Sequence, residues 1–176
     1  LLDGGELGAL VPLKSPAVCR IGRDMASALS LLHSRRLVYR DLNPRNVHCT
    51  AHGVAKLIDF GAATAMGPSR QVVGTPGYCA PEALDAQPLD ARTDLFSLGA
   101  TLYFALTGRH AFPAKTFEQL RGMWDTVPKR PSEIVPDVPV ALDALIMDLL
   151  HVDAALRPAN AAEVIEQLAA IDGSKV

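Results

Sequence analysis

Two short loops carry oxygen-bearing side chains of the kind that bind divalent cations. Asp41 and Asn46 lie within the run Tyr-Arg-Asp-Leu-Asn-Pro-Arg-Asn at residues 39–46, and Asp59 opens the triplet Asp-Phe-Gly. Mg²⁺ takes a few carboxylate or amide oxygens and completes its coordination with water and substrate phosphates. Each motif alone is also typical of an ordinary turn. Asp41, Asn46 and Asp59 are therefore candidate residues for Mg²⁺ chemistry.

Short apolar segments flank both loops. Residues 37–38 and Val47 border the first loop, and residues 55–58 predict a short strand after a His-Gly turn. Small residues, Gly and Pro dominate residues 61–81, which predicts a long irregular loop. Loops of more than ~12–15 residues in compact domains are usually functional, so residues 61–81 are a candidate part of a site.

Helical periodicity accounts for most of the remaining chain. Ser15 as N-cap and Pro16 as the first helical residue predict a helix whose apolar positions recur at three- and four-residue steps until residues 33–36. Further helices are predicted at residues 94–106, 116–123, 140–150 and 161–171. The predicted fold class is mainly α with a small β-hairpin region, in one domain over residues 1–176.

Composition and charge exclude several classes of protein. With 49% hydrophobic residues the chain is too apolar to be disordered, and its longest apolar stretch, residues 95–106, is shorter than the ~20 residues of a membrane span. The net charge of -2 argues against nucleic acid as a partner. The three cysteines lack zinc-site spacing and Leu1 begins no signal peptide, so we expect reduced, buried thiols and a cytoplasmic protein.

In this order and spacing, the motifs resemble the C-terminal lobe of eukaryotic-type serine/threonine protein kinases, with a composition similar to that of bacterial members. Residues 39–46 resemble the catalytic loop, and residues 59–61 resemble the magnesium-binding triplet. The Ala-Pro-Glu at residues 80–82 is similar to the end of the activation segment, which would span residues 59–82. Gly-Thr-Pro-Gly-Tyr at residues 74–78 resembles the substrate loop of the serine/threonine kinases.

The resemblance implies a role for each matching residue. Asp41 would orient the substrate hydroxyl and accept its proton, and Thr75 would reach Asp41. Asn46 and Asp59 would hold Mg²⁺ on the phosphates of ATP. Asn43 stands where these kinases place a Lys. The absence of that Lys could lower the rate of phosphoryl transfer by about 10²–10³.

The nucleotide side of the site is implied by three positions. The Leu2 backbone would meet the adenine and Glu6 the ribose. His48 stands where the family usually has an aliphatic residue beneath the base, which would alter the fit of the nucleotide. The implied cofactors are ATP and Mg²⁺, and the implied partner is a protein substrate.

The resemblance also implies residues that hold the catalytic loop in place and residues that regulate the activation segment. Asp94 would bond the backbone of the catalytic loop, and Glu82 with Arg157 would form a semi-buried ion pair that anchors the activation segment. Arg40 resembles the Arg that captures a phosphorylated residue of the segment, but Gln71 occupies the usual acceptor position. Two alternatives stay open: Gln71 hydrogen-bonds toward Arg40 with no phosphorylation, or phosphorylation shifts to Ser69.

No Gly-rich loop, Val-Ala-Ile-Lys strand or Glu-bearing helix lies within the printed chain. We expect an N-terminal lobe to precede Leu1 in a longer protein and the isolated chain to be inactive. The favoured function is therefore a protein kinase that transfers the γ-phosphoryl of ATP to Ser or Thr. A pseudokinase that serves as a protein-binding module is the alternative, and a small-molecule phosphotransferase is a weaker one.

Overall fold

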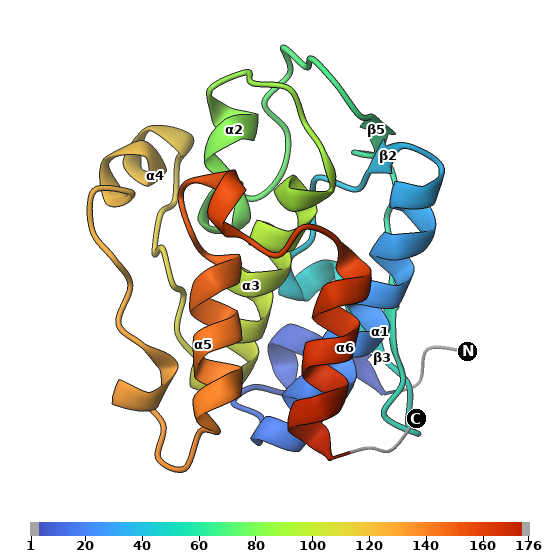
Figure 1. The fold of residues 1–176 in the computed structure, drawn as a ribbon, viewed down its shortest axis with the longest axis vertical. Helices are drawn as coiled ribbons and strands as arrows, with labels where there is room; N and C mark the ends of the chain where they lie inside the picture. Colours follow the sequence, from blue (N-terminus) through green and yellow to red (C-terminus); the bar gives the residue numbers. More distant parts are fainter. Residues whose placement is uncertain (1–3, 174–176) are drawn as a thin grey trace.

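Helices are the main elements of this computed structural model, which describes residues 4–173. Four longer helices pack together, and two shorter ones lie toward one side (Figure 1). The helices are α1 (Ser15–Ser34), α2 (Pro81–Leu84), α3 (Ala91–Thr107), α4 (Phe117–Met123), α5 (Val140–Leu149) and α6 (Ala161–Asp172). The predicted fold class, mainly α with a small β region, is confirmed, and each predicted helix forms within a few residues of its expected bounds.

The helix α3 forms the centre of the molecule. It is apolar around most of its circumference, which is typical of a helix buried on all sides, and α1 and α5 pack against it. A methyl group on Gly99 would come within 2.6 Å of the Leu149 Cβ on α5, so only glycine allows this close approach. Asp90 caps the start of α3, and Gly108 ends it in the left-handed conformation at φ 68°.

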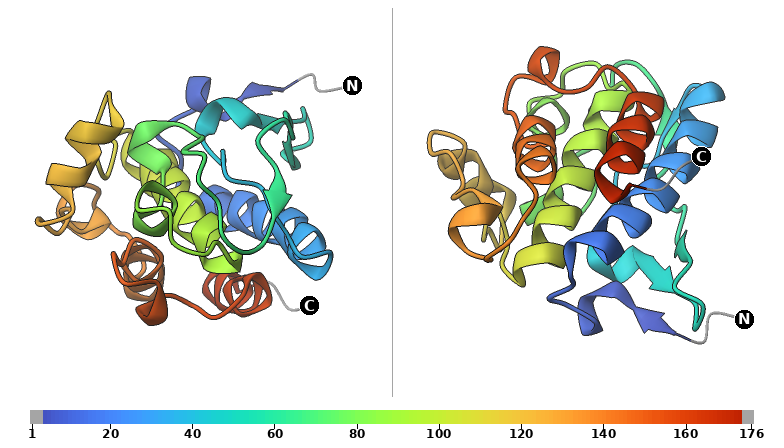
Figure 2. Two further views of the ribbon diagram at one scale, coloured as in Figure 1. Left: turned by 90° about the horizontal axis from the view of Figure 1, so that it is seen from above. Right: turned by 60° about the horizontal axis from the view of Figure 1, so that its bottom comes forward.

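The long helix α1 packs against α3 and α6, as a second view makes clear (Figure 2). Its predicted apolar face is correct, because Val18, Met25 and Leu29 are fully buried. The predicted N-cap is wrong by one residue. Ser15 is already helical and Lys14 occupies the cap position without a side-chain hydrogen bond, so Pro16 still lies in the first turn.

Two small antiparallel sheets accompany the helices. The strands β1 (Gly5–Glu6), β3 (Val47–Cys49) and β4 (Ala55–Leu57) form the first sheet in the order β1-β3-β4, with His48 opposite both Glu6 and Lys56. The strands β2 (Leu37–Val38) and β5 (Thr64–Ala65) form the second. Residues 61–81 are thus not wholly irregular as predicted, because β5 and a short 3-10 turn, η3 (Pro76–Tyr78), interrupt the loop.

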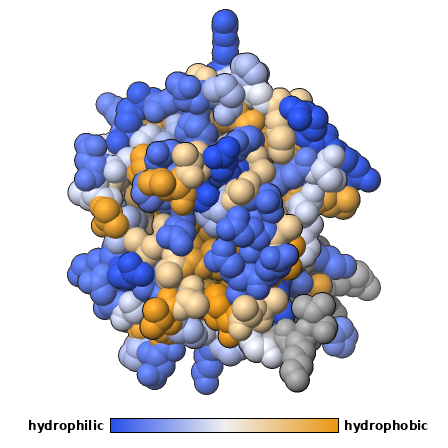
Figure 3. Space-filling model, viewed as in Figure 1, coloured by the Kyte–Doolittle hydropathy of each residue, from blue (hydrophilic) through white to orange (hydrophobic). Residues whose placement is uncertain are grey.

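The remaining sequence expectations concern the thiols and the membrane. Cys19, Cys49 and Cys79 are free and buried, and burial raises the pKa of Cys19 to about 11 and of Cys79 to about 12. Within residues 4–173, none of the helices combines the length and apolar character that crossing a bilayer requires. The surface is mixed, with hydrophilic residues predominating along the upper edge of the face in Figure 3.

Candidate active site

Asp94, in the first turn of α3, holds the start of the loop at residues 39–46. Its carboxylate is fully buried and accepts hydrogen bonds from the backbone N–H of Tyr39 and of Arg40, each at 2.8 Å. His33, at the end of α1, contacts the same carboxylate through Nε2 at 2.8 Å. A buried carboxylate needs such partners, and here they fix the backbone just before Asp41. The predicted contact of Asp94 with this loop is confirmed.

Three side chains surround the Asp41 carboxylate. The Thr75 hydroxyl donates to Oδ1 at 2.9 Å, so the two residues meet as predicted although they are far apart in the chain. Asn43 Nδ2 donates to Oδ1 at 2.9 Å, and Asn46 Nδ2 donates to Oδ2 at 3.0 Å. Asp41 itself is partly exposed, which leaves its carboxylate open to an incoming hydroxyl. The arrangement resembles an oriented general base.

Asn43 is integrated into the loop rather than directed away from it. It is 3% exposed, and its Nδ2 also lies 3.1 Å from the Thr75 hydroxyl. Its Oδ1 accepts the backbone N–H of Arg45 at 3.0 Å and so caps the 3-10 turn η2 (Pro44–Asn46). The side chain therefore links Asp41 to Thr75, but it provides no positive charge.

Tyr39 connects the 39–46 loop to Asp59. Its buried hydroxyl donates to the carbonyl oxygen of Ile58, whose N–H in turn donates to the Asn46 carbonyl at 3.0 Å. Burial, and then the neighbouring carboxylates, raise the pKa of this phenol above its ordinary value. The Tyr39 ring meets Phe60 edge to face, with centroids 5.4 Å apart. Asn46 and Asp59 thus come together at the end of β4.

The donor set at this junction fits Mg²⁺. The Nδ2 of Asn46 donates to both the carbonyl and the carboxylate of Asp41, which leaves the amide oxygen free to act as a ligand. One carboxylate oxygen of Asp59 accepts the Gly61 N–H at 3.1 Å, and the other carboxylate oxygen can bind a cation. In the described part of the chain no cluster of three or more His, Cys, Asp or Glu could hold a metal ion. Phosphate and water oxygens would have to complete the coordination.

Two non-glycine residues at this site adopt a left-handed backbone conformation. Arg40 has φ 75° and Asp59 has φ 60°. Such strain persists where the surrounding structure enforces it, and here the Asp94 and Tyr39 hydrogen bonds do so. Gly74, at φ 118°, allows the 59–82 segment to pass beside the loop, because a Cβ there would lie 2.8 Å from the Arg40 carbonyl oxygen.

The Arg40 guanidinium points into the 59–82 segment. It is 7% exposed and donates through Nη2 to the backbone carbonyl of Gln71, while its buried Nε has no hydrogen-bond partner in the described part of the chain. A hydrogen bond from Arg40 to Gln71 was one of the two alternatives predicted, and the backbone oxygen provides it rather than the side chain. Ser69 hydrogen-bonds the same carbonyl at 3.5 Å. These contacts connect the middle of the 59–82 segment to the 39–46 loop.

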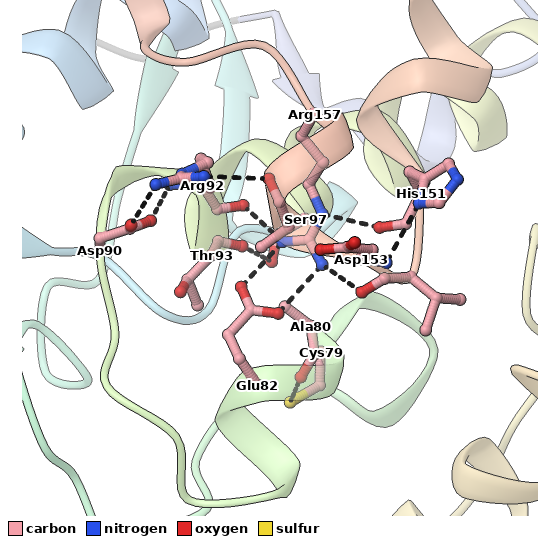
Figure 4. Close-up of polar contacts among 12 residues, drawn as sticks. Cys79, Ala80, Glu82, Asp90, Arg92, Thr93, Ser97, His151, Asp153 and Arg157 are labelled. Carbon is pink, nitrogen blue, oxygen red and sulfur yellow. Dashed lines mark hydrogen bonds and ion pairs between the residues drawn. The ribbon is translucent and has the colours of Figure 1, made fainter.

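The end of the segment is fixed by the predicted pair of Glu82 and Arg157 (Figure 4). The two side chains form a bidentate contact at 2.8 and 3.0 Å, with Arg157 fully buried and Glu82 13% exposed. The remaining N–H groups of Arg157 donate to three backbone carbonyls. Its guanidinium carbon lies 5.0 Å from the centroid of the Phe96 ring. Every donor of a buried guanidinium is therefore satisfied.

Residues predicted for the nucleotide lie on the first sheet. Glu6 on β1 is opposite His48 on β3, so the two predicted contacts are neighbours. The His48 Nδ1 is buried and has no hydrogen-bond partner among residues 4–173. Leu2, the third predicted contact, lies outside the described residues.

Sequence reasoning missed two histidines that support the site. The sequence indicates His33 only as part of the end of a helix, and its contact with Asp94 depends on the way α1 and α3 cross. His110 accepts or donates a 3.0 Å hydrogen bond with the Tyr78 hydroxyl and stacks on Phe104 at 4.8 Å. Burial lowers the pKa of His110, which favours its neutral form. No local pattern in the sequence indicates either contact.

Comparison with known proteins gives consistent results. The family model described as a protein kinase domain matches residues 2–168. A probable serine/threonine-protein kinase of Clostridium acetobutylicum is 33% identical over 160 residues, which cover 86% of this chain and 24% of the relative. A probable serine/threonine-protein kinase of Streptomyces coelicolor is 35% identical over 162 residues, covering 85% and 24%. The serine/threonine-protein kinase PknE of Mycobacterium tuberculosis is 32% identical over 155 residues, covering 83% and 27%. The chain thus spans about a quarter of the length of these relatives.

Proposed function

The chain belongs to the protein kinase domain family, and we propose that it is the C-terminal lobe of a kinase that phosphorylates Ser or Thr residues of proteins. The observation that carries this proposal is the set of hydrogen bonds on Asp41. Thr75 and Asn43 bond one carboxylate oxygen and Asn46 bonds the other. Such contacts orient an exposed carboxylate toward a substrate hydroxyl.

In this proposal Asp41 accepts the proton of the acceptor hydroxyl as phosphoryl transfer proceeds. Its two oxygens are held from different directions, so the carboxylate cannot rotate away from the substrate. Thr75 belongs to the substrate loop of the 59–82 segment and ties this loop to the base. Positioning of this kind is the main contribution of a protein to phosphoryl transfer, which needs little covalent chemistry from its side chains.

The proposed cofactors are ATP and Mg²⁺. Asn46 and Asp59 would hold the cation through amide and carboxylate oxygens, and bound Mg²⁺ would neutralise charge on the phosphates. Glu6 and His48 would contact the nucleotide from the first sheet. We also propose that an N-terminal lobe outside this chain supplies the remaining phosphate contacts, and the 51% exposure of Phe60 supports a covering partner at this edge.

The test uses the longest natural protein that contains this chain. We expect Asp59→Ala to abolish transfer from Mg²⁺-ATP to a protein substrate, because the cation loses its carboxylate ligand. Asp148→Ala is the control, since Asp148 is exposed on α5 with no side-chain partner among residues 4–173. If Asp59→Ala transfers phosphate at the wild-type rate at limiting Mg²⁺, Asp59 does not bind the cation and the proposed function is refuted.

One observation favours the binding-module alternative. Asn43 supplies no cation near the transferring phosphate, although it keeps the link between Asp41 and Thr75. If the protein is an enzyme, Asn43→Lys should raise the rate of transfer, because a positive charge would stabilise the phosphoryl group. If neither the wild type nor Asn43→Lys transfers phosphate while a protein partner still binds, the binding module is the better description.

A further inference from the structure

Arg45 carries an exposed positive charge close to Asp41 in the same loop. It lies on η2, one residue before Asn46, and its side chain is exposed. Its backbone N–H is used by Asn43, but its guanidinium makes no ion pair or hydrogen bond with any residue between 4 and 173. An exposed Arg without an internal partner is available to a charged ligand.

Arg45 lies beside the substrate loop, because Asn43 Oδ1 accepts the Arg45 N–H at 3.0 Å and Asn43 Nδ2 lies 3.1 Å from the Thr75 hydroxyl. Burial raises the pKa of the Tyr78 phenol, and the Arg45 charge is close enough to lower it in part. Tyr78 ends η3, which begins directly after Thr75. Arg45 and Thr75 therefore flank the same approach to Asp41.

A second cation without an ion pair among residues 4–173, Lys115, follows a stretch of chain that runs against η3. A Cβ at Gly77 would lie 2.7 Å from the Phe112 carbonyl oxygen and 3.8 Å from that of Ala114, so the chain before α4 runs against η3. Lys115 follows directly and is exposed. Its backbone N–H donates to Gln119, while its ammonium group has no partner within the described chain.

Most nearby carboxylates are neutralised. Glu82 is paired with Arg157, and Asp85 is paired with Arg121 at 2.8 Å. Glu118, in the first turn of α4, is the acidic residue near Lys115 that has no ion-pair partner in the region described. Among residues 4–173, Arg45 and Lys115 are thus exposed cations without an ion pair in this region, and Glu118 is an exposed carboxylate without one.

We propose that Arg45 and Lys115 select protein substrates that carry Asp or Glu on both sides of the acceptor Ser or Thr. This inference rests on the proposed kinase function and specifies its substrate class. An acidic side chain gains a charge-assisted contact with Arg45, whereas a basic one meets a like charge. Because the acceptor hydroxyl must reach Asp41, residues next to it pass close to η2, which carries Arg45, and to η3, against which the chain before Lys115 runs.

The test compares three peptides of equal length with a single Ser flanked by Glu, Gln or Lys. For the wild-type protein we expect kcat/KM to be about tenfold higher for the Glu peptide than for the Lys peptide, mostly through KM. Arg45→Glu should reverse this order, and Lys115→Glu should weaken the preference. Arg20→Glu is the matched control, because Arg20 is an exposed Arg on α1 with no ion pair within residues 4–173.

Binding of the same peptides is measured by fluorescence anisotropy at low and high salt. Tighter binding of the Glu peptide that is lost at high salt supports the proposal, and equal binding of all three peptides overturns it. A Glu preference that survives Arg45→Glu also overturns it. If no peptide is phosphorylated above the level of Asp41→Asn, the kinase function fails, and the anisotropy measurements still decide the charge preference.

Discussion

Removing the negative charge from the Glu82–Arg157 pair should cost a large part of the stability of the fold. Glu82→Gln keeps the shape of the side chain but leaves a fully buried guanidinium without its counter-charge. Loss of one partner of a buried ion pair costs about 3–5 kcal/mol, against a total of about 5–15 kcal/mol for a domain. For a chain of this size the melting temperature should fall by about 10 °C. The Arg157 guanidinium also donates hydrogen bonds to the backbone carbonyls of Arg92, His151 and Val152.

Urea unfolding followed by circular dichroism measures this cost, with an exposed ion pair as control. Arg121→Gln breaks the Arg121–Asp85 contact, whose side chains are 60% and 47% exposed, and should cost at most about 1 kcal/mol. Combining Glu82→Gln with Arg157→Met should cost less than the sum of the two single changes, because the charges are coupled. If Glu82→Gln costs no more than Arg121→Gln, the argument that this pair anchors the segment is refuted.

Three further changes test other parts of the structure. Gly99→Ala should destabilise by about 1–3 kcal/mol in urea unfolding, because its Cβ would overlap a leucine of α5; a neutral effect would contradict the close packing. Asp94→Asn should cost about 1–3 kcal/mol and abolish phosphoryl transfer, since an amide cannot accept all the hydrogen bonds of the carboxylate; retained transfer would contradict its positioning role. Burial raises the pKa of Asp143, but hydrogen bonds from Ser132 and Arg130 outweigh it and hold the pKa below the usual range. Its stabilising effect is therefore present above about pH 4 and lost as the pH falls further, so unfolding of Asp143→Asn between about pH 5 and 2 should depend less on pH than that of the wild type.

The sequence was informative wherever a contact depends on residue type and order. The run of apolar residues predicted the buried helix α3, and the resemblance to protein kinases implied that Thr75 reaches Asp41 and that Glu82 pairs with Arg157. The types and spacing of Asp41, Asn46 and Asp59 likewise indicated the candidate site.

Contacts that depend on backbone conformation could not be predicted. A hydrogen bond between Arg40 and Gln71 was one of the two predicted alternatives, but its acceptor, the backbone carbonyl of Gln71, was not predicted. No residue type imposes the φ of 75° that Arg40 adopts. The second sheet was missed because its strands are two residues long and show no alternation. The contact of His33 with Asp94 is set by the crossing of two helices.

The most direct test of the proposed function follows phosphate from γ-labelled ATP to a Ser peptide in the longest natural protein that contains this chain. The protein should form phosphoserine in the presence of Mg²⁺, and Asp41→Asn should lower the rate by about 10²–10⁴, because the substrate hydroxyl loses its base. Folding of the variant is checked by its urea midpoint. Equal formation of phosphoserine by the wild type and a folded Asp41→Asn variant would contradict the account.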